Sequence, residues 1–170
     1  MTNNRILLDS ALNQFQSARK YTLALIEGLE PDQWFWMPKP PVSNVAWQIG
    51  HLAVAQYGLM LFRQRGRQTE DAELLSSELR KLFSKGSSPP ADSKSYPRFD
   101  EILALLHRVN DQVMRETNSF NPESMDELTE PPHAGPLTRM GSILFAAHHE
   151  MLHCGQIGML RRMMGLSPLR

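Results

Sequence analysis

The sequence predicts an all-α protein in which long helices pack as a bundle. Four stretches repeat apolar residues at three- and four-residue steps, which is the spacing of one face of an α-helix. No stretch alternates convincingly between apolar and polar residues, as a half-buried strand would. The 170 residues are enough to enclose one hydrophobic core. We therefore expect a single domain over residues 1–170.

The first two helices are expected on either side of a proline-rich break. The first helix should run from about Arg5 to Leu29. The stretch EPDQWFWMPKPP follows, and its four prolines exclude a continuous helix, while its aromatic run WFW is expected to cover one end of the core. The second helix should begin at Ser43, a favourable N-cap, and end near RQRGR, whose positive charges suit a helix C-terminus.

A connection of about thirty residues separates the second helix from the third. Between Gln68 and Pro97 it contains DAELLSSELRKLF, which is expected to form a short helix, and SKGSSPPADSKSYP, which is expected to be a loop. A helix of about 20 residues is roughly 30 Å long, so a linker of this length can return along it. We therefore expect the third helix to run parallel to the second.

The third and fourth helices have clear boundary signals. The third should follow Pro97, and NPESMDEL after it is expected to form a short helical turn, with TEPPHAGP as a loop. The last helix should begin near Thr138 as N-cap and stop at Gly165, with Pro168 beyond it. The apolar face of the third helix is expected to consist of Ile102, Leu106, Val109 and Val113.

The charge balance argues against nucleic acid as a partner. Eighteen Lys and Arg face eighteen Asp and Glu, and no stretch is basic enough for a dense phosphate-binding face. A small neutral or anionic substrate is easier to accommodate. The single Cys154 cannot form an intramolecular disulfide, and MTNNRILLDS lacks the features of a signal peptide. We therefore expect a reducing, cytoplasmic location.

The segment from Pro40 to Phe62 has two possible interpretations. It contains no charged residue and is long enough to span a membrane. A helical membrane protein would need several such segments, and this chain has no other of comparable apolarity. The segment also carries the polar residues Asn44, Gln48, His51 and Gln56. We expect the most buried helix of a bundle and no membrane span.

Residues 149–153 spell H-E-x-x-H, the spacing of the zinc site in metallopeptidases. Residues four apart on a helix differ by about 40° around its axis, so His149 and His153 can bind one metal, while His148 lies about 100° away. A peptidase of the longer motif places a third ligand at the position of Met159, and no His, Asp or Glu follows His153. Such enzymes usually bind their peptide along a sheet, and this sequence predicts no clear sheet. A peptidase is therefore disfavoured.

The third metal ligand must then come from upstream, where His51 is the strongest candidate. It lies midway along the most apolar helix, where an imidazole without a partner would be costly. The preceding Gly50 would let another helix approach closely. The alternative is a core histidine bonded to a backbone carbonyl, but beside the four-spaced pair we prefer the metal site. His107 and His133 are weaker candidates, which can also line the mouth of a pocket.

Three segments of the sequence carry a family resemblance, which covers nearly the whole chain. WQIGHLA, LFSKGSSPPADSKSYPRFDEIL and HHEMLHCGQIGMLRRMMGLSP resemble the DinB-like (damage-inducible, YfiT-like) superfamily of metal-binding four-helix bundles. The most specific part is H-E-x-x-H-x-G-Q-I-x-x-L-R-R-x-x-G, joined by the W-x-x-x-H stretch from Trp47 to His51. The resemblance implies an up-down-down-up four-helix bundle, a homodimer and a three-histidine metal site formed by His51, His149 and His153.

Two functions remain open for such a site. Three imidazoles on a divalent ion, zinc first and nickel or iron as alternatives, leave at least one position for water or substrate. The resemblance includes thiol-dependent transferases and isomerases, and iron-dependent sulfoxide synthases. We favour a metal-dependent enzyme that transfers a low-molecular-weight thiol or hydrolyses a small substrate. The alternative is a metal-binding stress-response protein without turnover, and the fold alone does not choose between them.

The residues beside the predicted ligands have less specific roles. Glu150 points about 100° away from the ligand face, so we expect it to orient a ligand or hold a helix contact rather than act as a base. Gln156 lies nearer that face and can bond a ligand, line the pocket or make a helix contact. Cys154 is expected to be a buried, inert thiol. A fourth protein ligand would favour the stress protein, and an acid or base near the open position would favour the enzyme.

Overall fold

The computed structural model describes residues 3–40, 42–130 and 138–169. Within these ranges the regular structure is helical, with a single isolated bridge between Leu128 and Thr138 and no strand. The all-α prediction is therefore confirmed. The longest helices are α1 (Asn3–Ile26), α3 (Val45–Tyr57), α7 (Phe99–Thr117) and α8 (Arg139–Met163).

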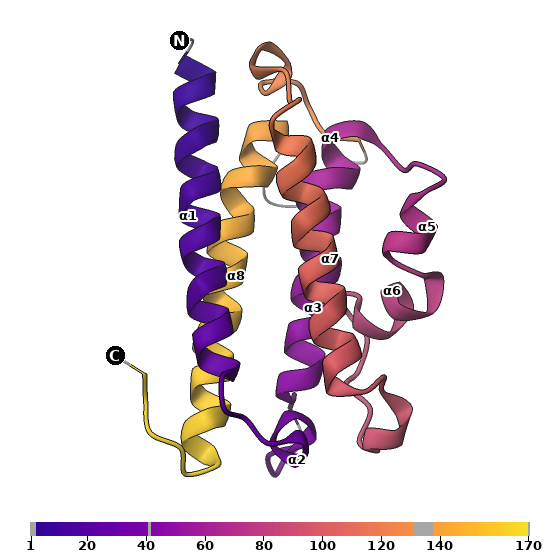
Figure 1. Ribbon diagram of the computed structural model, residues 1–170, viewed down its shortest axis with the longest axis vertical. Helices are drawn as coiled ribbons and strands as arrows, with labels where there is room; N and C mark the ends of the chain where they lie inside the picture. Colours follow the sequence, from indigo (N-terminus) through magenta and orange to yellow (C-terminus); the bar gives the residue numbers. More distant parts are fainter. Residues whose placement is uncertain (1–2, 41, 131–137, 170) are drawn as a thin grey trace.

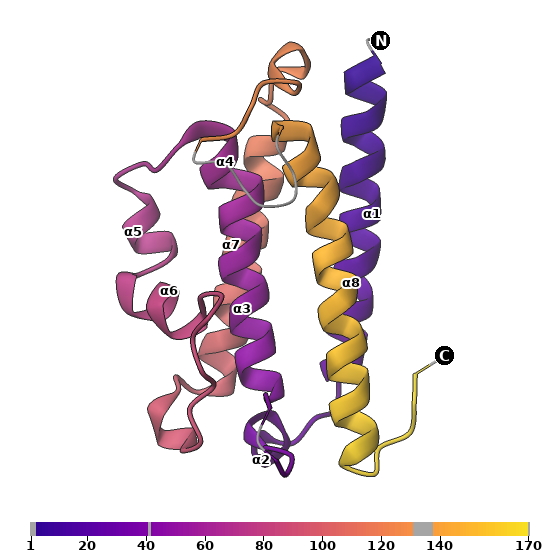
Figure 2. The same ribbon diagram turned by 180° about the vertical axis from the view of Figure 1, so that it is seen from behind.

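These four helices lie side by side along the long axis of the molecule (Figures 1 and 2). Helix α1 packs mainly on α8, and α3 packs mainly on α7 and also on α8. In Figure 1, α1 and α8 descend, whereas α3 and α7 both ascend. The connection that contains α5 and α6 returns along the outside of the α3 and α7 pair. It brings the chain back to the end from which α3 started.

The first helix ends before the expected boundary. Helix α1 stops at Ile26, and Gly28 follows with a φ of 71°, a left-handed conformation that ends helices. The short helix α2 (Pro31–Phe35) occupies the proline-rich break. Trp34 is buried there, and the two neighbouring aromatic residues are half-buried against the core.

The second helix begins one residue later than predicted, so the assignment of Ser43 as N-cap was wrong. Asn44 is the cap, and its side chain accepts a hydrogen bond of 2.8 Å from the backbone N–H of Trp47. The Ser43 hydroxyl instead accepts a bond of 2.9 Å from the Gln48 amide. Helix α3 continues through the π-helical turn η1 (Gly58–Phe62) into α4 (Arg63–Arg65). Gly66, the glycine of the RQRGR run, has a φ of 76° and ends this helix, as expected.

The predicted short helix of the connection is split in two. Helix α5 (Asp71–Leu74) stops at an extended residue, and α6 (Ser77–Phe83) begins anew with Ser76 as its N-cap. The short 3₁₀ turns η2 (Ser93–Ser95) and η3 (Pro122–Ser124) flank α7. The last helix begins as predicted, with Thr138 as its N-cap. The Thr138 hydroxyl accepts a hydrogen bond of 3.0 Å from the backbone N–H of Gly141.

A buried polar network links all four long helices. The Arg19 guanidinium of α1 binds the Glu150 carboxylate of α8, with Nε 2.6 Å from Oε1 and Nη2 3.1 Å from Oε2. The same Nη2 donates to the Gln56 side chain of α3 at 3.0 Å, and the Gln56 amide donates to Asn110 of α7 at 3.1 Å. Buried ionic groups are tolerated when they are paired in this way. The network fixes the relative rotation of the helices.

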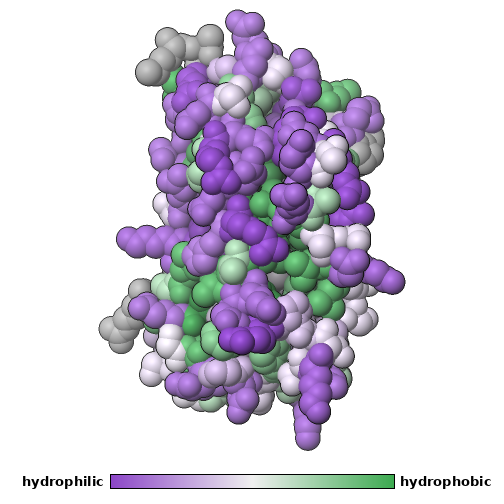
Figure 3. Space-filling view, turned by 45° about the vertical axis from the view of Figure 1, so that its right-hand side comes forward, coloured by the Kyte–Doolittle hydropathy of each residue, from purple (hydrophilic) through white to green (hydrophobic). Residues whose placement is uncertain are grey.

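The surface is mostly hydrophilic on the face in Figure 3, with apolar residues emerging between polar ones in its lower half. No helix of the described ranges combines the length and the apolarity that a membrane span needs.

A second ionic cluster ties the end of α4 to α5 and α7. Arg65 Nη2 lies 2.8 Å from Asp71 Oδ1, and Arg65 Nε lies 2.6 Å from Glu116 Oε2. Burial alone would raise the pKa of Asp71, but hydrogen bonds from Arg65, the Gln68 N–H and the Tyr57 hydroxyl lower it below its ordinary 3.8. Burial would likewise raise the pKa of Glu116, but the bonds from Arg65 dominate and lower it. The folded state therefore releases these protons more readily than the unfolded chain does.

Replacing Asp71 with Asn should make the protein less stable by about 2 kcal/mol near pH 7. A lowered pKa in the folded state stabilises the fold above the ordinary pKa, and this stabilisation disappears as the pH falls through the folded value. The difference between wild type and Asp71→Asn should therefore shrink below the ordinary value of 3.8. Urea denaturation across this pH range measures it. Asp111→Asn, an exposed change on α7, is the matched control, and an equal loss for Asp71→Asn at all pH values would contradict the prediction.

Candidate metal centre

The structure brings together the three histidines that the sequence singles out. His149 and His153 lie one turn apart on α8, and their Nε2 atoms are 3.3 Å apart. His51 comes from α3, with its ring centroid 5.3 Å from that of His149 and 4.9 Å from that of His153. One ring nitrogen from each of the three lies within 4.8 Å of the others. Since α3 packs on α8, the site spans two helices that are about a hundred residues apart in sequence.

Hydrogen bonds on the outer side of two rings orient this cluster. His51 Nδ1 donates to the Phe83 carbonyl at 2.7 Å, which leaves Nε2 for the centre of the cluster. His153 Nδ1 donates in the same way to the side-chain oxygen of Gln48. The Gln48 amide nitrogen donates to Ser43, so its oxygen faces His153. Metal-binding histidines are almost always held by their second nitrogen in this manner. The carbonyl expected for a core histidine is therefore present at His51, but it occupies only one nitrogen.

The cluster fits a divalent metal ion that prefers nitrogen ligands. Nitrogen ligands of a tetrahedral zinc are about 3.3 Å apart, given zinc to nitrogen bonds of about 2.0 Å, and the pair on α8 is 3.3 Å apart. Burial, together with the neighbouring His149 and His51, lowers the pKa of His153 to about 3. Burial also lowers the pKa of His51. The bond to the Phe83 carbonyl raises this pKa by a smaller amount, and the Lys85 charge lowers it further. Neutral imidazoles are the form that binds zinc, nickel or iron.

An aromatic ring and a loop cover one side of His51. The Trp47 indole stacks on the His51 imidazole with centroids 4.8 Å apart and an interplanar angle of 6°. Its Nε1 donates to the Ser87 hydroxyl at 3.1 Å, and that hydroxyl donates to the Leu82 carbonyl at 2.8 Å. The segment that follows α6 is thus fixed over α3 and holds the ring plane of His51.

Gly50 allows this segment to come close enough to hold His51. A Cβ atom at position 50 would lie 2.4 to 2.5 Å from three ring carbons of Phe83, far inside contact distance. The Phe83 side chain is fully buried in the core, so it has no room to withdraw. The close approach expected at Gly50 therefore involves α6, and it places the Phe83 carbonyl on His51.

A cavity of about 170 Å³ opens beside His51 and His149. Its walls come from α3, η1, the start of α4, the residues after α6, and α8. Two cationic side chains, Arg63 and Lys85, and the ring of Phe145 contribute to the lining. No Asp or Glu is among the described residues that line it. The cavity gives a small molecule access to two of the three histidines.

The glutamate of the H-E-x-x-H stretch lies on another side of α8. Glu150 is buried, and it binds Arg19 and accepts a bond of 2.7 Å from the Thr22 hydroxyl of α1. These bonds direct the carboxylate toward α1. Cys154 is also buried against Thr22, with Sγ and the hydroxyl oxygen 3.1 Å apart, and burial raises the pKa of its thiol. It has the surroundings of an inert thiol.

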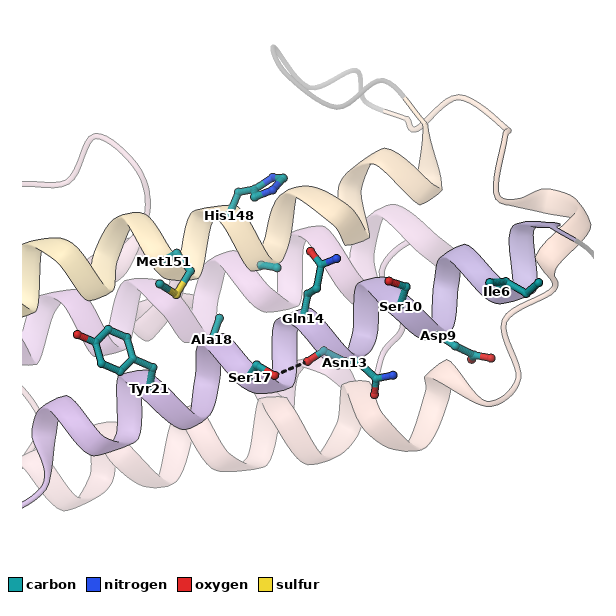
Figure 4. A pocket seen from close by; sticks show the side chains of 11 residues that line it. Ile6, Asp9, Ser10, Asn13, Gln14, Ser17, Ala18, Tyr21, His148 and Met151 are labelled. Atoms are coloured by element: carbon teal, nitrogen blue, oxygen red, sulfur yellow. Dashed lines mark hydrogen bonds between the residues drawn. The ribbon is translucent and has the colours of Figure 1, made fainter. Parts of the chain in front are cut away.

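The other candidate residues lie away from the three histidines. Gln156 is exposed and lines a separate groove with Trp47 and Gln48, and its side chain makes no hydrogen bond within the described part of the chain. His148 is exposed and lines the groove between α1 and α8 that Figure 4 shows, and His107 is exposed on α7. His133 lies outside the described residues.

Sequence reasoning missed the role of Gln48. The available signal was a polar side chain three residues before His51 on an otherwise apolar helix, where an unsatisfied amide would be costly. Its partner His153 is 105 residues away, so the pairing depends on how α3 packs against α8.

Replacing Gln48 with Leu should lower the affinity for a divalent metal by about tenfold to a hundredfold, because the bond that orients His153 is lost. Gln156→Leu removes the same kind of side chain from a neighbouring exposed position and should leave the affinity unchanged. Competition with a chromogenic chelator measures both. An equal loss in the two variants would contradict the assignment of Gln48.

Replacing Gly50 with Ala should lower both stability and metal affinity. The added methyl group displaces Phe83, which should make the protein less stable by about 2 kcal/mol and withdraw the carbonyl from His51. Gly155→Ala is the matched control, since a Cβ at that exposed position on α8 meets no atom within 4 Å. Thermal denaturation and metal titration of both variants are the measurements, and a Gly50→Ala protein that matches wild type in both would refute the prediction.

Comparison with known proteins agrees with this geometry. The family model of the DinB superfamily matches residues 14–157, a range that contains all three histidines of the cluster. The search of curated proteins found no match to the chain. The match covers well over half of the sequence and includes all of α3 and most of α8, the two helices that carry the histidines. The chain belongs to the DinB superfamily.

Proposed function

We propose that the protein is a metal-dependent enzyme that transfers a low-molecular-weight thiol, with a divalent ion held by His51, His149 and His153. Zinc is the first candidate, with nickel and iron as alternatives. The observation that carries the proposal is the convergence of one nitrogen from each ring within 4.8 Å, at the wall of a cavity. We further propose that these histidines sit in an up-down-down-up four-helix bundle.

The number of protein ligands supports catalysis over a purely structural metal. Structural zinc sites are closed by four protein ligands, whereas catalytic sites keep one position for water or substrate. Within the described residues, the group that can hold a metal consists of three histidines and no fourth His, Cys, Asp or Glu. The cavity along His51 and His149 gives a substrate a route to the open position. A stress protein that only stores or senses metal would not need this route.

The lining of the cavity favours thiol transfer over hydrolysis. A bound divalent ion lowers the pKa of a thiol or a water molecule placed at its open position. Hydrolysis would also need a general base for the attacking water or an acid for the leaving group. Glu150 is paired with Arg19, and no carboxylate of the described residues lines the cavity. A thiolate is itself the nucleophile and needs no such base.

Several further expectations belong to this proposal. The partner is a small thiol and its electrophile rather than a nucleic acid, and the protein works as a homodimer in the cytoplasm. The neutral charge balance supports the first of these expectations. The alternative function, metal binding in a stress response without turnover, predicts the same metal content but no consumption of thiol.

Elemental analysis of the purified protein should find about one equivalent of divalent metal per chain. His51→Ala and His153→Ala should lose it, because each removes one of three ligands. His148→Ala changes an exposed neighbour of the site and should retain the metal. Wild type that stays metal-free after reconstitution with zinc, nickel or iron would overturn the metal site.

Turnover should be tested on the same set of proteins. Loss of free thiol in the presence of a small electrophile should depend on the metal and fall to the uncatalysed rate in His51→Ala. Full metal content without any acceleration across a panel of thiols and electrophiles would favour the non-catalytic alternative.

A further inference from the structure

Two cationic side chains, Arg63 and Lys85, line the cavity without a carboxylate among the described lining residues. Arg63 begins α4, directly after the π-helical turn, and Lys85 lies two residues beyond the end of α6. Arg63 precedes the connection between α4 and α7, and Lys85 lies within it. Between them the cavity wall is formed by His51 and His149, the two histidines with access to its interior. Positive charge is therefore concentrated at the entrance to the predicted metal site.

Arg63 differs from the paired arginines of the described chain. Its Nε is buried and has no hydrogen-bond partner among the described residues, and burial lowers the pKa of its guanidinium. Within the described residues no Asp or Glu forms an ion pair with Arg63, and an oxyanion bound in the cavity would supply that missing counter-charge. The arginines that do pair with a carboxylate are Arg5, Arg19, Arg65, Arg98 and Arg139.

Lys85 adds a second charge on the same side of the cluster. It lines the same cavity as Arg63, His51 and His149. Arginine binds an oxyanion through a planar fork, and lysine contributes a point charge on a flexible stem. Together with the histidines, the two side chains surround a space that suits a small anion.

We propose that Arg63 and Lys85 form an oxyanion subsite next to the three histidines. This inference rests on the proposed function, and it restricts the thiol substrate of the proposed enzyme to thiols that carry an anionic group. The thiol carries a carboxylate or phosphate group a few atoms away from its sulfur, so that the anion meets Arg63 and Lys85 while the sulfur reaches the open metal position. The cavity of about 170 Å³ holds the volume of about six water molecules. This part of the substrate is therefore short.

The test uses the cobalt(II)-loaded protein, because a thiolate bound to cobalt gives a charge-transfer absorption that reports binding without turnover. Wild type is titrated with 3-mercaptopropionate and with its methyl ester, which has the same thiol and no charge. The acid should bind at least about tenfold more tightly than the ester. Arg63→Gln and Lys85→Gln should each weaken binding of the acid and leave binding of the ester unchanged.

Matched controls separate the subsite from general electrostatics. Arg67→Gln and Lys81→Gln remove the same charges from exposed positions near Arg63 and Lys85, and both should behave like wild type. Lys85 is itself exposed, so its variant keeps the test valid if Arg63→Gln fails to fold. Competition by propionate and by inorganic phosphate then tells which oxyanion the subsite prefers.

The outcomes distinguish the two proposals. Failure of cobalt to bind, or cobalt retained in His153→Ala, overturns the metal site and the subsite with it. Cobalt bound at the histidines with equal affinity for the acid and the ester overturns the subsite alone. Equal losses in the control variants, or no competition by either anion, also overturn it. Selective loss of acid binding in Arg63→Gln and Lys85→Gln supports it.

Discussion

The packing of Phe83 against Gly50 is the contact on which the histidine cluster depends. Because residue 50 has no side chain, the Phe83 ring lies directly on the backbone of α3. The Phe83 carbonyl then reaches His51 at 2.7 Å and directs the other nitrogen of that ring toward α8. The loop after α6 stays in place through the bond between Trp47 and Ser87. A segment far from the metal ligands in sequence thereby sets the geometry of one of them.

The H-E-x-x-H stretch serves two faces of the same helix. His149 and His153 face α3, while Glu150 faces α1 and binds Arg19. In a metallopeptidase the same glutamate would act as the base beside the metal. Here the carboxylate holds the bundle together, and its partner Arg19 extends the network to Gln56. In this stretch the two histidines face the predicted metal site, whereas the glutamate makes a structural contact between helices. The direction of Glu150 therefore distinguishes this site from that of a metallopeptidase.

Local signals in the sequence predicted much of the fold, and long-range packing decided the rest. The helical periodicity, the Thr138 cap and the four-residue spacing of His149 and His153 are properties of neighbouring residues, so they could be derived directly. Ser43 and Asn44 are both good caps, and the choice depends on the Ser43 hydroxyl accepting the Gln48 amide. Gln48 in turn faces His153 on α8. Such a chain of contacts becomes visible only when α3 and α8 are packed together.

The π-helical turn η1 determines which residue of the second helix faces the cavity. Along α3 the lining residues His51, Ala55 and Gly58 follow the usual three- and four-residue steps. A regular α-helix would place Phe62 next, four residues after Gly58. The wider turn makes that step five residues long, with the N–H of Arg63 bonded to the Gly58 carbonyl, and it presents Arg63 to the cavity instead. The wider turn thus places a positive charge where the same sequence in a regular α-helix would place the aromatic ring of Phe62, beside the three histidines.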